Sequence, residues 1–175
     1  RWMEQGRTPI KVSVNYSSIQ FFERNFVDNI INIINEYELD PHFLIMEITE
    51  SVFMKNPEKA IVDIKRLQAE GIQVALDDFG TGYSSLSYVK RLPVATLKID
   101  QSFVRNIDTD VNDTAIIRAI VTLGHSLKLK IVAEGVETNE QAARLQEEKC
   151  DVLQGFLFGR PMPQSSFVDF VEKSA

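Results

Sequence analysis

The 175-residue sequence contains few of the residues that build disulfides and zinc sites. It has one cysteine, Cys150, and two histidines, His42 and His125, which lie far apart in the chain. A single cysteine excludes an intramolecular disulfide and fits a reducing cytosol. No Cys/His cluster is available for zinc. We therefore expect a cytoplasmic domain in which these three residues have ordinary structural roles.

Long apolar runs and an excess of positive charge are absent as well. No run approaches the roughly 18 apolar residues of a membrane-spanning helix, so we expect no direct membrane insertion by this segment. A membrane tether elsewhere in a longer parent protein is compatible with that. The formal net charge is −6 at pH 7, whereas nucleic-acid grooves are bound by basic surfaces. We therefore expect no DNA or RNA duplex as a partner.

Short apolar segments alternate with amphipathic helical patterns along the chain. The strands are predicted at 11–15, 44–48, 73–77, 96–100, 130–134 and 152–154. The helices are predicted at 26–37, 57–70, 84–92, 114–127, 139–149 and 165–173, with Asn139 and Ser165 as N-caps and a solvated loop at 106–113. Strand and helix alternate about six times, which predicts an α/β fold with mainly parallel strands.

Each predicted strand carries polar residues at or near its carboxyl end. They are Asn15, Glu47, Asp77, Lys98, Asp100, Glu134 and Gln154. The alternate positions are apolar and are expected to pack under helices: Val12, Val14, Leu44, Met46, Val74, Leu76, Leu97, Ile99, Ile131, Ala133 and Leu153. An open doubly wound sheet and a (β/α) barrel both fit the alternation. Functional residues at six strand ends favour the barrel, because many strand ends converge on one mouth there.

The chain is short for a whole barrel. Eight units typically need about 250 residues, whereas 175 are present. The residues before the first strand, 1–6, have the pattern of a helix end. We therefore expect an incomplete TIM-like barrel of about six βα units, a partial domain over 1–175 whose N-terminal units are missing. Its open edges would seek partners, which predicts a homodimer or other homo-oligomer, or reduced stability.

Two adjacent carboxylates, Asp77 and Asp78, end an apolar run and precede a loop that contains Gly80 and Gly82. Neighbouring strand residues point to opposite faces, so both carboxylates can reach one site only where the strand is ending. An ordinary surface turn fits this motif alone equally well. Polar residues at the other strand ends favour a metal site. Carboxylate and amide oxygens suit Mg²⁺ or Mn²⁺ better than a softer metal.

Taken together, these segments resemble the bacterial EAL domain family. The matching blocks are Asn15 with Ser17, Glu47-Ile48-Thr49-Glu50, Asp77-Asp78-Phe79-Gly80-Thr81-Gly82, Lys98-Ile99-Asp100, Ala133-Glu134-Gly135-Val136-Glu137 and Gln154-Gly155, in order from about Val12 to Pro161. That family hydrolyses the second messenger cyclic di-GMP to linear diguanylate (pGpG). The resemblance implies a cyclic di-GMP-specific phosphodiesterase of bacterial signalling. The Glu-Ala-Leu signature near the start of the family's domain appears nowhere in these residues.

The resemblance also implies a two-metal site. Asn15, Glu47 and Asp77 would bind one ion, whose remaining protein ligand would be the absent signature glutamate. Asp77 would bridge to a second ion together with Asp78, and Glu134 would lie in or near that coordination sphere. Two ions can activate a water and neutralise charge on the attacking and leaving oxygens of a phosphodiester. An acidic protein that handles an anionic dinucleotide needs such ions.

Further roles follow from the same resemblance. Lys98 would hydrogen-bond the attacking water and Asp100 would orient that group or the water, although a purely structural Lys98–Asp100 ion pair also fits the sequence. Glu50 would steady the loop 79–85, and Gln154 would lie at the mouth near the metals or the phosphate. In the family, the region comparable to 106–113 helps domains to dimerise.

Two classes of function remain open. The retained ligands favour a metal-dependent phosphodiesterase for the parent protein. The missing signature glutamate favours weak or absent activity for this piece alone. The alternative is a noncatalytic cyclic di-GMP-binding regulatory module.

Overall fold

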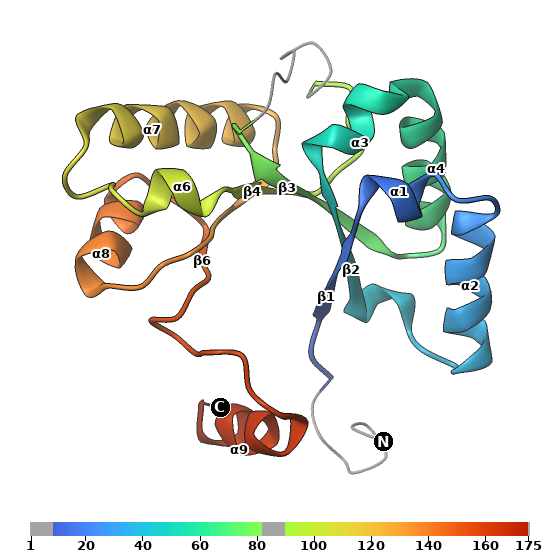
Figure 1. The fold of residues 1–175 in the computed structure, drawn as a ribbon. Coiled ribbons are helices and arrows are strands. Elements are labelled where there is room, and N and C mark those ends of the chain that lie inside the picture. The colour runs from blue at the N-terminus through green and yellow to red at the C-terminus, as the bar shows by residue number, and fades with distance from the viewer. Residues whose placement is uncertain (1–8, 82–89, 175) are drawn as a thin grey trace.

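The computed structural model describes residues 9–81 and 90–174, which form one six-stranded sheet with helices packed against it (Figure 1). The strands are β1 (Val12–Tyr16), β2 (Leu44–Thr49), β3 (Gln73–Phe79), β4 (Thr96–Ile99), β5 (Lys130–Ala133) and β6 (Val152–Leu153). The helices are α1 (Ser18–Phe21), α2 (Phe26–Glu36), the 3-10 helix η2 (Pro41–Phe43), α3 (Glu50–Lys55), α4 (Pro57–Ala69), α6 (Gln101–Val104), α7 (Val111–Ser126), α8 (Asn139–Glu147) and α9 (Gln164–Ser174). No described helix has the length and hydropathy that crossing a bilayer requires.

The strand order distinguishes the two candidate architectures. Every strand pairs in parallel with its neighbours in sequence, in the order β1-β2-β3-β4-β5-β6. A doubly wound sheet reverses its strand order at a switch point, whereas a barrel keeps the sequential order. The prediction of an incomplete TIM-like (β/α) barrel is confirmed.

The outer face of the sheet is the hydrophobic core. Met46, Leu76 and Ile131 are fully buried there, as their alternation predicts. The first strand differs, because Val12 and Val14 are 52% and 36% exposed. Within the described residues β1 is an edge strand, and the side chains of both valines are only partly covered there. The expectation that both valines are buried was therefore wrong.

Five of the six predicted helices are present, but several of their ends differ from the prediction. Helix α7 begins three residues earlier than expected, because Asp110 accepts a hydrogen bond from the Asn112 amide at 2.7 Å and caps it there. The predicted loop 106–113 therefore includes the first turn of α7. Helix α8 is capped by Thr138 rather than Asn139, and Ser165 lies inside α9.

The helix predicted at 84–92 falls mostly outside the described residues. Of that range the structure describes only 90–92, which are not helical.

Candidate metal centre

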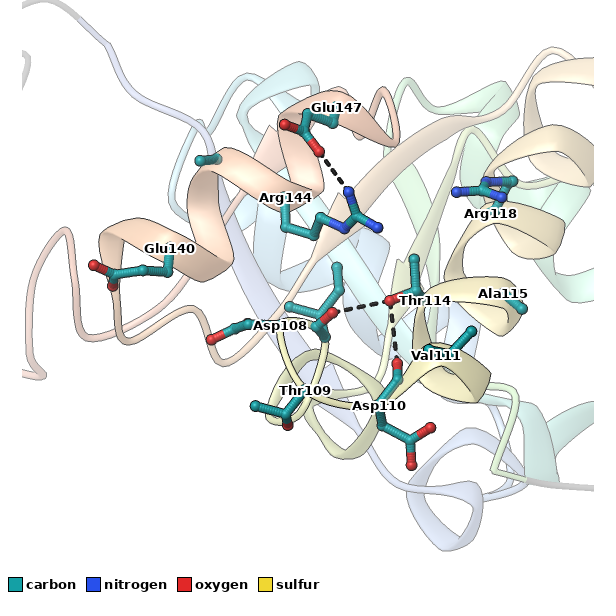
Figure 2. A pocket seen from close by; sticks show the side chains of 12 residues that line it. Asp108, Thr109, Asp110, Val111, Thr114, Ala115, Arg118, Glu140, Arg144 and Glu147 are labelled. Carbon is teal, nitrogen blue, oxygen red and sulfur yellow. Dashed lines mark hydrogen bonds and ion pairs between the residues drawn. The ribbon is translucent and has the colours of Figure 1, made fainter.

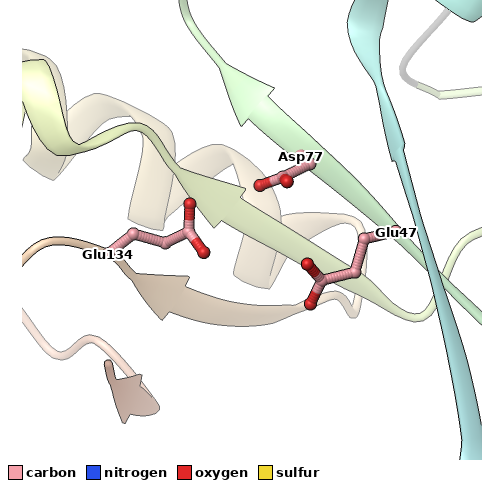
Figure 3. A group of neighbouring side chains, drawn as sticks. All are labelled: Glu47, Asp77 and Glu134. Atoms are coloured by element: carbon pink, nitrogen blue, oxygen red, sulfur yellow. The ribbon is translucent and has the colours of Figure 1, made fainter. Parts of the chain in front are cut away.

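Three acidic side chains from neighbouring strand ends surround Lys98 of β4. Figure 3 shows how the carboxylates of Glu47, Asp77 and Glu134 face a common space. The Lys98 Nζ lies 2.5 Å from a Glu47 oxygen, 2.6 Å from a Glu134 oxygen and 3.2 Å from an Asp77 oxygen. The structural ion pair with Asp100 does not form. One ammonium group faces three largely buried carboxylates, so the cluster carries excess negative charge that favours a further cation.

Asn15 completes this group because β1 lies in register beside β2. Asn15 is directly opposite Glu47, and Thr49 is opposite Asp77. The Asn15 amide oxygen faces only oxygen acceptors; with the amide turned over, its nitrogen donates to Glu47 at 3.0 Å and to Asp77 at 3.3 Å. An amide oxygen directed at carboxylates is also the arrangement that a shared cation stabilises. This environment therefore fits a ligand set of one amide and several carboxylates.

Burial sets the protonation behaviour of Glu134. Burial raises the pKa of Glu134 to about 7; Lys98 lowers it, and the charges of Asp77 and Glu47 raise it. Burial alone would lower the pKa of Lys98, but hydrogen bonds to Glu134 and Glu47 raise it above its ordinary value. The lysine therefore stays charged at neutral pH, and Glu134 can gain or lose a proton there.

A second pair of carboxylates, Asp78 and Asp100, lies beside the first group. Burial raises the pKa of Asp78, and the nearby charges of Asp77 and Asp100 raise it further. The Asp78 amide donates to the Asp77 carboxylate at 3.0 Å. Asp100 also caps α6 by accepting from the Ser102 amide at 2.9 Å. The two acidic groups could hold two ions through all-oxygen ligands, and Asp77 of the first group is hydrogen-bonded to the backbone of Asp78 in the second.

The way that Asp77 and Asp78 both reach this region differs from the expectation. The strand does not end at Asp77 but continues to Phe79. Its register with β4 shifts between Leu76 and Phe79, and Asp78 has a left-handed φ of +54°. This bulge redirects the second carboxylate, since a regular strand would point neighbouring side chains to opposite faces.

Two further predicted residues have less complete surroundings. Glu50 is 5% exposed in the first turn of α3, and within the described residues neither of its carboxylate oxygens has a hydrogen-bond partner. Its predicted loop partner falls largely on residues 82–89, outside the described residues. Gln154 follows β6, and its backbone carbonyl accepts from the Val136 amide at 3.0 Å. The roles of Glu50 and Gln154 remain predictions.

Sequence reasoning missed Gly155, which follows Gln154. A Cβ atom at Gly155 would lie 2.1 Å from the Val136 carbonyl oxygen. Only glycine allows this contact between the segments that follow β6 and β5, and the latter carries Glu134. Gly155 and Val136 are far apart in the sequence, so alternation patterns cannot predict their contact. The one sequence signal for Gly155 was its place in the matching block Gln154-Gly155.

A cavity of about 470 Å³ lies between the α6–α7 connection and α8 (Figure 2). Its lining includes Asp108, Val111, Arg118 and Arg144, and none of the predicted site residues. It is therefore separate from the metal centre.

Comparison with known proteins agrees with the motif blocks. The EAL domain family model matches residues 1–161. The chain belongs to the EAL domain family. This EAL domain is 47% identical over 162 residues to the bifunctional diguanylate cyclase/cyclic di-GMP phosphodiesterase MucR of Pseudomonas aeruginosa, a match that covers 93% of this chain and 24% of MucR. The chain thus spans about a quarter of that relative.

Solved structures give the same family. The PaMucR phosphodiesterase in complex with c-di-GMP superposes with a TM-score of 0.90 at 46% identity, covering 95% of this EAL domain and 67% of that chain. The manganese/cy-diGMP complex of Klebsiella pneumoniae BlrP1 superposes with a TM-score of 0.81 at 29% identity, covering 91% and 41%. These neighbours bind the dinucleotide, and one of them binds it together with manganese.

Proposed function

We propose that this EAL domain is the phosphodiesterase part of a longer protein, which hydrolyses cyclic di-GMP to linear pGpG with two Mg²⁺ or Mn²⁺ ions. The observation that carries the proposal is the convergence of Asn15, Glu47, Asp77 and Glu134 around Lys98, beside the second pair Asp78 and Asp100. Two relatives support the substrate and the metal class: MucR is a bifunctional diguanylate cyclase/cyclic di-GMP phosphodiesterase, and BlrP1 forms a complex with manganese and cyclic di-GMP.

The residues around Lys98 have distinct parts in this proposal. Bound ions would neutralise the phosphodiester and favour an attacking hydroxide. Lys98 stays protonated and holds the attacking water by a hydrogen bond, next to the developing negative charge. Glu134, whose carboxylate lies 2.6 Å from the Lys98 Nζ, would lie in or near the coordination sphere of the second ion. Asp100 orients this water or the lysine, and Gln154 contacts the substrate at the mouth.

A noncatalytic cyclic di-GMP-binding module is the second candidate. By resemblance the signature glutamate supplies a ligand of the first ion, and these 175 residues contain no Glu-Ala-Leu segment. We therefore expect the 175-residue chain alone to bind Mn²⁺ and to hydrolyse cyclic di-GMP weakly or not at all.

The test compares this chain with a completed domain, defined as the chain preceded by the MucR residues that complete the EAL domain upstream of the match. We expect the completed domain to release pGpG with Mn²⁺ or Mg²⁺ and to lose activity with EDTA. Tight cyclic di-GMP binding by calorimetry without pGpG would establish the regulatory module instead. Neither binding nor hydrolysis would contradict both candidates.

We also propose that the domain forms a homodimer or other homo-oligomer. Two features support this: within the described residues β1 and β6 each pair with one strand, and Val111 beside the cavity of Figure 2 is 82% exposed. Light scattering of the chain and of Val111→Glu tests the proposal. A monomeric chain at micromolar concentration would contradict it, and a smaller mass for the variant would locate the contact.

A further inference from the structure

Gln141, in the first turn of α8, is a buried glutamine whose side-chain oxygen and nitrogen both have hydrogen-bond partners. It is 6% exposed. Its Oε1 accepts hydrogen bonds from the backbone amides of Glu137 at 2.7 Å and Thr138 at 3.1 Å. Its Nε2 donates to the backbone carbonyl of Arg105 at 3.2 Å. A buried amide with partners on both ends fixes the relative position of the segments that it joins.

These two segments both carry residues of the metal centre. Glu137 and Thr138 follow Glu134 after β5, whereas Arg105 is the C-cap of α6, the helix that begins directly after Asp100 and β4. The ladder between β4 and β5 ends with the pair Ile99 and Ala133 and one further bond from the Glu134 amide to the Ile99 carbonyl at 3.2 Å. Beyond that point Gln141 links the segments.

The contact between the segments is also tight at Gly135. This residue has φ +70°, and a Cβ there would lie 2.5 Å from the Gln101 Cβ. The segment after β5 therefore lies directly against the start of α6. A shift of one segment against the other would change the 2.6 Å contact between Glu134 and Lys98.

We propose that Gln141 is a positioning residue of the metal centre. Its bridge to the Arg105 carbonyl holds the segment that carries Glu134 at a fixed position relative to the segment that carries Lys98 and Asp100. The inference rests on the proposed function, because it assigns to Gln141 an effect on a metal ion that these carboxylates bind. Partners that orient metal ligands commonly change metal affinity by 10–100-fold when they are lost.

A purely local role for Gln141 must be separated from this one. Gln141 and Thr138 form a capping box, in which the backbone N–H of Gln141 donates to the Thr138 hydroxyl at 3.2 Å. Glutamate serves equally well at this position of a capping box. Gln141→Glu therefore keeps the acceptor for Glu137 and Thr138, but it replaces the donor to Arg105 with a carboxylate oxygen.

The experiment measures Mn²⁺ affinity of the 175-residue chain by calorimetry, at a temperature well below the unfolding midpoint of every variant. We expect Gln141→Glu to weaken Mn²⁺ binding about tenfold. The matched control is Gln146→Glu, the same change on the exposed side of the same helix, and we expect it to bind as wild type does. Equal affinity of Gln141→Glu and wild type would overturn the positioning role alone. A wild-type chain that bound no Mn²⁺ would overturn the proposed metal site and this inference together.

A second pair of variants serves if Gln141→Glu does not fold. Gln141→Met keeps the length of the side chain without adding a charge, and it removes the bridge together with the acceptor for the Glu137 and Thr138 amides. Thr138→Val removes the hydroxyl partner of the capping box and leaves the bridge. We expect weaker Mn²⁺ binding for Gln141→Met and unchanged binding for Thr138→Val. The same loss in both variants would mean that helix capping, not the bridge, is responsible.

Discussion

Two ion-pair sites in this domain use buried carboxylates in opposite ways. Between α7 and α8, Arg118 donates two hydrogen bonds to the buried Glu148, at 2.7 and 2.8 Å. Hydrogen bonds from Arg118 lower the pKa of Glu148. At the metal centre, three carboxylates share Lys98, and burial raises the pKa of Glu134 to about 7.

The difference lies in the balance of charge. Arg118 and Glu148 satisfy each other, so their pair is complete without a ligand. Lys98 cannot neutralise Glu47, Asp77 and Glu134 together. Perturbed ionisable groups concentrate at functional sites, and here burial raises the pKa of Glu134 first, with a further rise from the charges of Asp77 and Glu47. The cluster around Lys98, in which the charges do not balance, is therefore the one to test for chemistry.

The largest expected effect is that of Asp77→Asn in the completed domain. The substitution keeps the shape of the side chain but removes the charge of the residue that would bridge the two ions. We expect hydrolysis of cyclic di-GMP to fall to background and the circular dichroism spectrum to stay unchanged. Product formation is measured by chromatography. Full activity in this variant would reject the bridging role of Asp77.

Lys98→Ala is expected to have the next largest effect. Removing the ammonium takes a hydrogen-bond donor from the attacking water while the metal ligands remain. We expect turnover in the completed domain to fall roughly 10²–10³-fold, with a much smaller change in cyclic di-GMP binding. Lys130→Ala is the control and should behave as wild type, because Lys130 is exposed at the start of β5, at the opposite end of that strand from Glu134. A defect confined to binding would count against the role of Lys98 in turnover.

Gly155→Ala tests the backbone contact that supports the segment of Glu134. Its new Cβ would meet the Val136 carbonyl oxygen at 2.1 Å, and backbone cannot move aside as a flexible side chain can. We expect a loss of roughly 1–3 kcal/mol of unfolding free energy, measured by urea denaturation.

The matched control for that change is Gly159→Ala. A Cβ at Gly159 would lie 3.4 Å from Phe170, which is an ordinary contact. The control should therefore be nearly neutral. Equal stability of the two variants would show that the loop after β6 relaxes freely.

The smallest effect is expected at the balanced pair. The folded-state pKa of Glu148 is lowered, so the pair stabilises the fold above the unfolded pKa of glutamate and loses this contribution as pH falls through the folded value. Arg118 is largely exposed, so solvent weakens the interaction. We expect Arg118→Ala to lower the melting temperature slightly at neutral pH, with the difference vanishing in acid. A constant difference across that range would show that packing, not charge, is lost.

The barrel was predictable because polar residues at six strand ends point to one shared mouth, and the buried face of each strand was predictable because alternation reports it. Met46 and Leu76 follow that rule, and Val14 departs from it because exposure at β1 depends on neighbours that its own pattern does not specify. Helix starts were less predictable where two capping residues are adjacent, since Thr138 and Asn139 both suit an N-cap.

The sequence predicted which residues belong to the site better than it predicted the contacts between them. Polar residues at strand ends identified Glu47, Asp77 and Glu134, which the structure brings together. Two details were not readable. Lys98 selects Glu47, 51 residues away, over the nearby Asp100. The left-handed Asp78 produces a bulge that an Asp-Asp pair does not specify.

The sequential strand order also determines how disturbance travels through the sheet. Among the described residues each strand pairs only with the strands before and after it, so we expect the six-stranded sheet of this chain to open first at β1 and β6. Asn15 on β1 and Gln154 after β6 therefore lie where opening starts. Glu47, Asp77 and Lys98 lie on β2, β3 and β4, three of the four strands between them, and we expect their arrangement to outlast the loss of either outer strand.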